Sequence, residues 1–542
     1  MKEGNTVSKR KYGSLVSNPA IEDYALRYVP KSFRKWSEFV VANSALGGIA
    51  YLADFAIGGS LVVSYGFTNA LLGIIIASII IFLTGIPIAY YSAKYNVDMD
   101  LLTRGAGFGY LGSTITSIIY ASFTFIYFSL EGSVMAQAIS LYFGIDIRIA
   151  YAIAALIIIP LVIYGMTFLS RLQLYAQPIW FILMLIPLIV ILNRDPSSLS
   201  VWTSFGGEAN TVQFNPLLTG LAAGVVLSLI AQIGEQADYL RFMPEKTSRN
   251  SNKWWLFVIL SGPGWIFLGM FKQIYATFLA SNIASTVGLV KATEPIYQFL
   301  FGYNLLFGSF AISLTIATLF IIISQIKINV TNAYSGSLSW SNFFSRIFHI
   351  HPGRVTWVVL NVLIALTLME LGVFYELNFV LGFYSNVAIA WIGAVVADLV
   401  INKKLLKISP DYIEFKRGHL YKINPVGFVP MILGSVISIV AFFGLLGPIA
   451  QAFSPFISLA IAFLLTPVMA ILTSGKYYIA RKSDDSIDER HECVLCGFTY
   501  EKPDILYCPY HKGFVCSLCC TLEKSCHESC KGELKPSSFR LT

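Results

Sequence analysis

Long apolar runs alternate with short polar or charged segments from about residue 37 to residue 475. A helix needs about 20 residues to cross the roughly 30 Å of hydrocarbon in a bilayer. Apolar runs of that length predict twelve membrane-spanning helices, at residues 37–63, 68–93, 110–143, 148–169, 175–193, 214–240, 254–280, 303–333, 355–375, 378–401, 425–446 and 449–474. The pattern therefore predicts an all-α integral membrane protein.

Composition and charge support this class. Hydrophobic residues make up 56% of the chain and charged residues only 13%, whereas soluble domains carry about a quarter of charged residues. Lys and Arg gather in the first 35 residues and in every second gap between spans, for example in Arg241–Lys253 and Lys403–Lys422. The positive-inside rule then predicts that both termini are cytoplasmic. We expect a plasma-membrane location, in a bacterium the inner membrane, and the net charge of +8 gives no support for nucleic-acid binding.

The chain divides by composition into five parts. A polar, basic N-terminal segment covers residues 1–35 and lacks the pattern of a cleaved signal peptide. The predicted parts after it are a transporter-like domain of twelve helices at 36–475, a charged linker at 476–491, a cysteine-rich module at 492–532 and a tail at 533–542.

All eight cysteines of the chain lie in the cysteine-rich module, and most of them form close pairs. Thiolates two residues apart can bind one ion from a single tight turn. Four such pairs predict two structural zinc ions, with the ligands Cys493, Cys496, Cys508, His511, Cys516, Cys519, Cys526 and Cys530. The pairing can be sequential, or interleaved so that the first and third pairs share an ion. Disulfides are the alternative, but they are rare in the reducing cytoplasm where we expect this module.

Polar residues inside the first and third spans indicate an internal site, because an ionisable group that faces lipid costs several kcal/mol. Gly47 and Gly48 weaken the first span and can mark a helix break whose carbonyls bind a cation, although close helix packing is the alternative. Tyr127 and Glu131 are four residues apart and share a helical face. A ring and a carboxylate there suit a flat, nitrogen-rich ligand; a purely structural glutamate is the alternative.

The sixth and eighth spans carry further polar groups. Gln232 and Gly234 indicate a second helix break. The eighth span holds Gln325, Lys327, Asn329 and Asn332 within two helical turns, which is too many amides for contact with lipid. These residues predict a polar cavity beside the eighth span.

Four segments resemble the nucleobase:cation symporter-1 family, which comprises the purine–cytosine permeases and their hydantoin and allantoin relatives. They are EDYALRYVPKSFRKWSEF, YFSLEGSVMAQAI, QADYLRFMP and, most specifically, KINVTNAYSGSLSWSNFFSR. The resemblance covers about residues 20–475 and leaves the cysteine-rich module outside. It implies a five-plus-five inverted-repeat fold with two extra helices, in which the broken first and sixth helices form the substrate site.

The resemblance also implies roles for individual residues. Tyr127 takes the position of a stacking aromatic, commonly Trp, and Glu131 that of an amide that binds the substrate ring. Asn329 takes the position of the substrate-binding asparagine, and Gln232 belongs to the second break beside the substrate. One departure is that the stacking Trp often found in the sixth span is missing, because no Trp occurs between residues 212 and 239.

Cation coupling is the second departure from the family. Members that use sodium hold it with first-helix carbonyls and small hydroxyls of the eighth helix, which implies Gly47, Gly48 and Ser324. Lys327 lies one turn beyond Ser324, so we expect its ammonium in or beside the sodium position, giving sodium-independent or proton-coupled behaviour with Glu131 as proton partner. The alternative is that Lys327 snorkels, or pairs with Glu235 or Asp238.

Two functions fit these expectations. The first is cation-coupled secondary transport of a nucleobase or related planar heterocycle by alternating access. The second is a membrane sensor, in which ligand binding shifts the helix bundle and the zinc module passes that change to a cytosolic signalling partner. An enzyme is not expected, because the spans offer no nucleophile–base pair and the zinc ligand sets are complete, as in structural sites.

Overall fold

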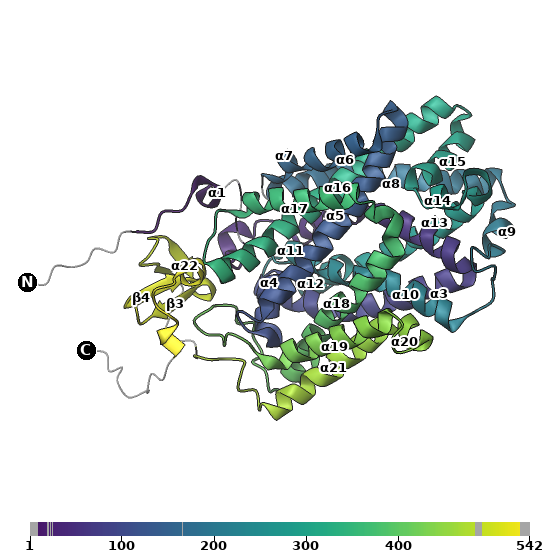
Figure 1. Cartoon of the computed structure of the whole chain (residues 1–542). Helices are drawn as coiled ribbons and strands as arrows, with labels where there is room; N and C mark the ends of the chain where they lie inside the picture. The colour runs from purple at the N-terminus through teal and green to yellow at the C-terminus, as the bar shows by residue number, and fades with distance from the viewer. Residues whose placement is uncertain are drawn as a thin grey trace, which may run out of the picture.

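The computed structural model describes residues 9–18, 21, 23, 25–164, 166–482 and 490–531. Parts of the predicted N-terminal segment and linker, and the whole predicted tail at 533–542, lie outside these residues. Long helices form one bundle, and a small module of strands lies at one end of it (Figure 1).

Helices cover all twelve predicted spans. The helices of the bundle are α2 (Glu38–Gly47), α3 (Ala53–Tyr95), α5 (Ser113–Phe143), α6 (Ile147–Leu156), α7 (Ile158–Val162), α8 (Met166–Arg194), α10 (Pro216–Leu227), α11 (Gln232–Leu240), α12 (Ser251–Ser261), α13 (Trp265–Val287), α16 (Phe310–Phe348), α17 (Arg354–Glu370), α18 (Leu377–Ala397), α19 (Pro425–Phe442), α20 (Pro448–Ala452) and α21 (Ser454–Leu472). Shorter connecting helices are α1 (Ser14–Ser17), α4 (Met99–Thr103), α9 (Ser198–Thr203), α14 (Leu289–Ala292) and α15 (Pro295–Phe307).

Length and composition mark the bundle as membrane-spanning. Within the described part of the chain, nine helical stretches are long and apolar enough to cross a bilayer, and Glu38–Ala50 and Ile147–Val162 are shorter apolar segments. One of the nine, α3, holds the second half of the first predicted span and the whole second span, which Gly66 separates with its positive φ of 75°. The protein is therefore a multi-pass membrane protein.

The predicted starts of the fifth and eighth spans were wrong. The fifth span, predicted from residue 175, lies in α8, which begins at Met166. The prediction of 303–333 began inside α15, whereas the structure ends α15 at Phe307 and begins the long helix α16 at Phe310. Gly308 takes the left-handed conformation (φ 62°) that ends α15. The prediction joined the two helices into one span because the sequence stays apolar through the turn between them.

The first and sixth spans are both broken, as the resemblance implied. The first break lies where expected: α2 ends at Gly47, a 3-10 turn covers Gly48–Ala50, and α3 begins at Ala53. The second break is a 3-10 turn at Ser228–Ala231, so the expectation of a break at Gln232–Gly234 was a few residues late. Gly234 instead allows close packing, since an added Cβ would lie 2.5 Å from the ring of Tyr120.

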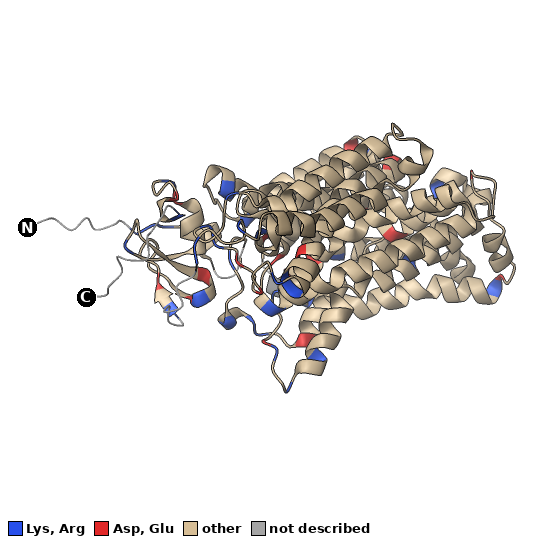
Figure 2. Cartoon of the chain, turned by 90° about the horizontal axis from the view of Figure 1, so that it is seen from below, with Lys and Arg blue, Asp and Glu red and all other residues tan. Residues whose placement is uncertain are grey.

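The module at the end of the bundle contains two short antiparallel strand pairs and a helix. β1 (Arg490–Glu492) pairs with β2 (Thr499–Glu501), and β3 (Ile505–Cys508) pairs with β4 (Gly513–Cys516), which leads into α22 (Ser517–Leu522). Lys and Arg gather at the end of the bundle that carries this module, and few charged residues lie along the long helices (Figure 2). This distribution agrees with the charge pattern read from the sequence.

Candidate functional site

Helix α5 connects the two breaks through the two residues that the sequence placed on one helical face. The hydroxyl of Tyr127 lies 2.7 Å from the hydroxyl of Ser228, the first residue of the second break. The carboxylate of Glu131 accepts bonds of 3.1 Å from the backbone N–H groups of Leu52 and Ala53, where the second half of the first span begins. Tyr127 and Glu131 are both buried. One face of α5 therefore contacts both breaks.

Glu131 acts as a cap on α3. The first N–H groups of a helix have no partner within the helix and carry partial positive charge, so a carboxylate stabilises them. Glu131 meets this requirement from another helix. Its oxygens accept bonds from the backbone in this structure, and its expected role in binding the substrate ring stays a prediction.

Sequence reasoning missed Lys272 of α13, which binds the other side of the first break. Its ammonium donates to the carbonyl oxygens of Ile49 (2.7 Å) and Tyr51 (2.8 Å). It also forms an ion pair of 2.9 Å with Asp54, and both side chains have no exposed surface. A lone lysine in the seventh span was the signal that the sequence offered for this contact.

Lys327 of α16 contacts helix α8. Its ammonium donates to Gln177 Oε1 (2.9 Å) and to the carbonyl of Gln173 (3.3 Å), both on α8. Lys272, not Lys327, binds the first-helix carbonyls. Gln173, to which Lys327 donates, lies against the first break, since a Cβ added at Gly47 would lie 2.6 Å from Gln173 Cβ. The expectation that the Lys327 ammonium lies in or beside the sodium position stays a prediction. The hydroxyl of Ser324 donates to the carbonyl of Phe320, one turn back in its own helix.

Several buried amides and carboxylates near α5 and the breaks have a polar atom without a partner in the described structure. Asn329 Oδ1 accepts a bond of 3.2 Å from Asn332, which leaves Asn329 Nδ2 and Asn332 Oδ1 unpaired. Gln232 donates 2.7 Å to Glu235 Oε2, which leaves Glu235 Oε1 unpaired. Asn329 borders α5, since a Cβ added at Gly132 would lie 3.8 Å from its Nδ2. Buried polar atoms normally have partners, so these atoms mark a place for a polar ligand or water.

A cavity of about 330 Å³ leads away from the first break along α3. It begins at Ala56, two residues after Asp54, and continues past Ser60 and Ser64; Phe374 and Asn378 line the opposite side. Its size matches that of small-molecule sites. The cavity lies beside the part of α3 that follows the first break.

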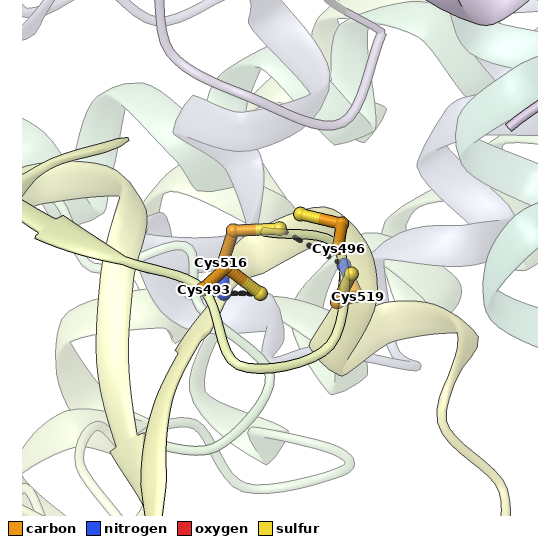
Figure 3. Close-up of side chains that lie close together, drawn as sticks. All are labelled: Cys493, Cys496, Cys516 and Cys519. Carbon is orange, nitrogen blue, oxygen red and sulfur yellow. Dashed lines mark hydrogen bonds between the residues drawn. The ribbon is translucent and has the colours of Figure 1, made fainter. Parts of the chain in front are cut away.

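Four buried cysteines of the module form a candidate metal centre (Figure 3). The sulfur atoms of Cys493, Cys496, Cys516 and Cys519 all lie within 4.8 Å of one another. Zinc bound tetrahedrally at about 2.3 Å from each sulfur needs sulfur–sulfur distances of about 3.8 Å. The first and third pairs therefore come together, which is the interleaved arrangement.

The second predicted ligand set is not gathered in this way. Within the described residues, Cys508, His511, Cys526 and Cys530 do not form a comparably tight cluster. His511 Nε2 lies 3.1 Å from Glu523 Oε2 instead. Burial raises the pKa of Cys520 to about 12, and the thiols of Cys530, Cys508 and Cys526 add to this. Cys520 thus lies near three of the predicted ligands.

The module docks on the bundle and on the N-terminal segment. Arg27 forms a 2.9 Å ion pair with Asp504. Arg417, in the connection between α18 and α19, donates 2.9 Å to the carbonyl of Cys520. The hydroxyl of Tyr12 lies 2.9 Å from the sulfur of Cys519, one of the four clustered cysteines. The metal centre is therefore in direct contact with the N-terminal segment.

Comparisons with known structures support the fold. A nucleobase-cation-symport-1 transporter, Mhp1, closed with bromovinylhydantoin bound, is similar at TM-score 0.58 and 17% identity over 85% of this chain and 100% of that one. The inward-facing form of Mhp1 is similar at TM-score 0.58 and 16% identity, over 86% of this chain and 96% of that one. A Na⁺-coupled sialic acid symporter is similar at TM-score 0.55 and 12% identity, over 84% of this chain and 94% of that one. No curated protein sequence matches the chain.

The family model decides the assignment. The model described as "Permease for cytosine/purines, uracil, thiamine, allantoin" matches residues 28–457, which include both breaks, α5 and α16. This match extends over most of the chain, and its members are transporters, not enzymes. The protein therefore belongs to the cytosine/purine permease family, the nucleobase:cation symporter-1 family.

Proposed function

We propose that the protein is a cation-coupled secondary transporter of a nucleobase or a related planar nitrogen heterocycle. The observation that carries this proposal is the contact of α5 with both helix breaks through Tyr127 and Glu131. Broken helices that meet at one place supply the fixed site around which alternating access occurs. Family membership supports a small heterocyclic substrate.

The ring of Tyr127 provides the stacking surface, because aromatic faces suit flat heterocycles. Asn329 Nδ2 donates to a ring carbonyl or nitrogen, and the unpaired oxygens of Asn332 and Glu235 accept ring N–H groups. Gln232 orients Glu235 through its 2.7 Å bond. The alternation of donors and acceptors matches the edge of a cytosine, uracil, purine or hydantoin ring.

The ligands of the module suit zinc. Four buried thiolates without an open position are typical of a structural site. We assign one ion to Cys493, Cys496, Cys516 and Cys519. A second ion would use Cys508, Cys526 and Cys530, with His511 or Cys520 as the fourth ligand. Thiolate ligation needs a reducing compartment, which agrees with cytoplasmic termini and a location in the plasma membrane, in bacteria the inner membrane.

A sensor is the second candidate function, and the docking of the module favours it. The module contacts the N-terminal segment through Arg27 and Tyr12, and the connection after α18 through Arg417. His349, just after α16, lies 2.7 Å from the carbonyl of Thr521. Helix α16 carries Asn329, so a ligand-induced shift of this helix would reach the module directly, and from it a cytosolic partner.

The decisive experiment measures transport and binding side by side. The purified protein is placed in proteoliposomes and supplied with radiolabelled cytosine, uracil, hypoxanthine, adenine and allantoin, with and without sodium and an inward proton gradient. Equilibrium binding of the same compounds is measured in detergent. We expect saturable, gradient-dependent accumulation of one class of heterocycle.

Binding without accumulation would contradict transport and favour the sensor. Neither binding nor uptake of any of the five compounds would contradict the assignment of the substrate class. Liposomes without protein provide the background for the uptake measurement.

A further inference from the structure

Three oxygen atoms surround the ammonium of Lys272. They are the carbonyl oxygens of Ile49 (2.7 Å) and Tyr51 (2.8 Å) and Asp54 Oδ2 (2.9 Å). The two carbonyls accept hydrogen bonds from the ammonium, and the Asp54 carboxylate forms an ion pair with it. The ring of Tyr51 adds a further contact, with its centroid 3.8 Å from the nitrogen. The ammonium is thus bound by backbone carbonyls, a carboxylate and an aromatic face.

The acceptors of this site are those that a small hard cation would need. Carbonyl and carboxylate oxygens bind such cations, and unwound carbonyls at helix breaks bind coupling ions in transporters of this architecture. In this chain a side chain supplies the positive charge, because Lys272 Nζ occupies the space between these oxygens.

Lys272 and Glu131 bind different backbone groups of the first break. Lys272 donates hydrogen bonds to carbonyl oxygens that follow α2, and Glu131 accepts hydrogen bonds from the N–H groups at the start of α3. In a membrane such groups must find partners inside the protein. Together the two side chains provide partners for backbone groups on both sides of the break.

We propose that Lys272 is a resident cation of the first helix break, which replaces sodium at this position and leaves transport independent of sodium. This inference rests on the proposed transport function and narrows its coupling ion. Asp54 supplies the counter-charge, and Gln273 fixes it through a 2.6 Å bond to Oδ1. Lys272 is a positioning residue, since it acts through the backbone of the break.

Removing the lysine should convert the position into a sodium site. In Lys272→Ala the two carbonyls and the Asp54 carboxylate would surround a void with one negative charge. We expect the melting temperature of the detergent-purified variant to rise by about 3 °C or more in sodium chloride relative to choline chloride at equal ionic strength. The unmodified protein should melt at the same temperature in both salts.

Two variants serve as controls. Lys327→Ala removes a buried lysine whose ammonium bonds Gln177 and Gln173 rather than a carboxylate, so its melting temperature should not respond to sodium. The double variant Lys272→Met with Asp54→Asn removes both charges and should be insensitive to sodium as well.

Sodium stabilisation of the unmodified protein, or its absence in Lys272→Ala, would overturn the proposal. If Lys272→Ala cannot be purified in either salt, the unmodified protein still provides the test. Because melting needs neither substrate nor flux, the result is independent of whether the chain proves to be a transporter or a sensor.

Discussion

Individual residues at the two breaks combine structural and binding roles. The hydroxyl of Tyr127 lies 2.7 Å from that of Ser228 in the second break, and its ring is the stacking surface of the proposed substrate site. The two roles can be separated, because phenylalanine retains the ring and loses the hydroxyl, whereas alanine loses both. Tyr127 is therefore the residue at which stacking can be measured directly.

Tyr127→Ala should weaken substrate binding about tenfold, because aromatic stacking contributes about 0.5–1.5 kcal/mol beyond the area that is buried. Tyr127→Phe should bind nearly as tightly as the unmodified protein. Equilibrium binding of the labelled heterocycle that the panel identifies provides the measurement. Equal losses in both variants would show that the hydroxyl, and not the ring, contributes the affinity.

At the level of helices, the approach of α3 to α13 allows Lys272 to reach the break. The two helices touch at Gly58, where an added Cβ would lie 2.2 Å from the carbonyl oxygen of Gln273 and 2.9 Å from the Cβ of Ala276. The backbones cannot stay this close with any larger residue at position 58. Gln273 follows Lys272 directly, so a shift of α13 here also displaces the ammonium.

Gly58→Ala should therefore destabilise the bundle by about 1–3 kcal/mol, the usual cost of overpacking. Gly224→Ala is a matched control in α10, since its Cβ would meet Pro455 at an ordinary 3.5 Å. Alanine also favours a helix over glycine by about 1 kcal/mol, so this control should be neutral or stabilising. Thermal unfolding of both variants in the same detergent distinguishes them, and equal melting temperatures would contradict the close approach.

At the level of the whole molecule, the module and the N-terminal segment form one structure around the metal centre. Tyr12 contacts Cys519, and the N–H of Arg10 donates to the carbonyl of Leu495, between two of the clustered cysteines. A small module of this size has too little apolar core to fold firmly without metal. If the four cysteines bind zinc as proposed, we expect metal binding to fix the position of the N-terminal segment as well.

Cys493→Ser should cost the protein one zinc ion and release the N-terminal segment, because the module loses the ligand geometry that holds it together. Metal content by mass spectrometry and the rate of tryptic cleavage at Arg10 and Lys11 provide the two measurements. Val494→Ser changes an exposed neighbour and should keep both properties. Full zinc content in Cys493→Ser would exclude this cysteine as a ligand.

The sequence by itself determined the features that depend on local pattern. Apolar runs gave the membrane spans, because crossing a bilayer imposes a minimum length. The spacing of Tyr127 and Glu131 predicted their common face, since helical geometry repeats every 3.6 residues. Closely spaced cysteines predicted a metal centre, and the structure gathers the first and third pairs.

Tertiary structure alone decided which lysine serves the first break. Residues 272 and 49 are 223 positions apart, and no local pattern relates them. Lys327 had the more suggestive neighbours, yet α16 turns its ammonium toward α8. Lys272 reaches the carbonyls because α13 packs closely along α3. Charges inside a membrane take the partners that packing brings within reach, and packing is a property of the whole fold.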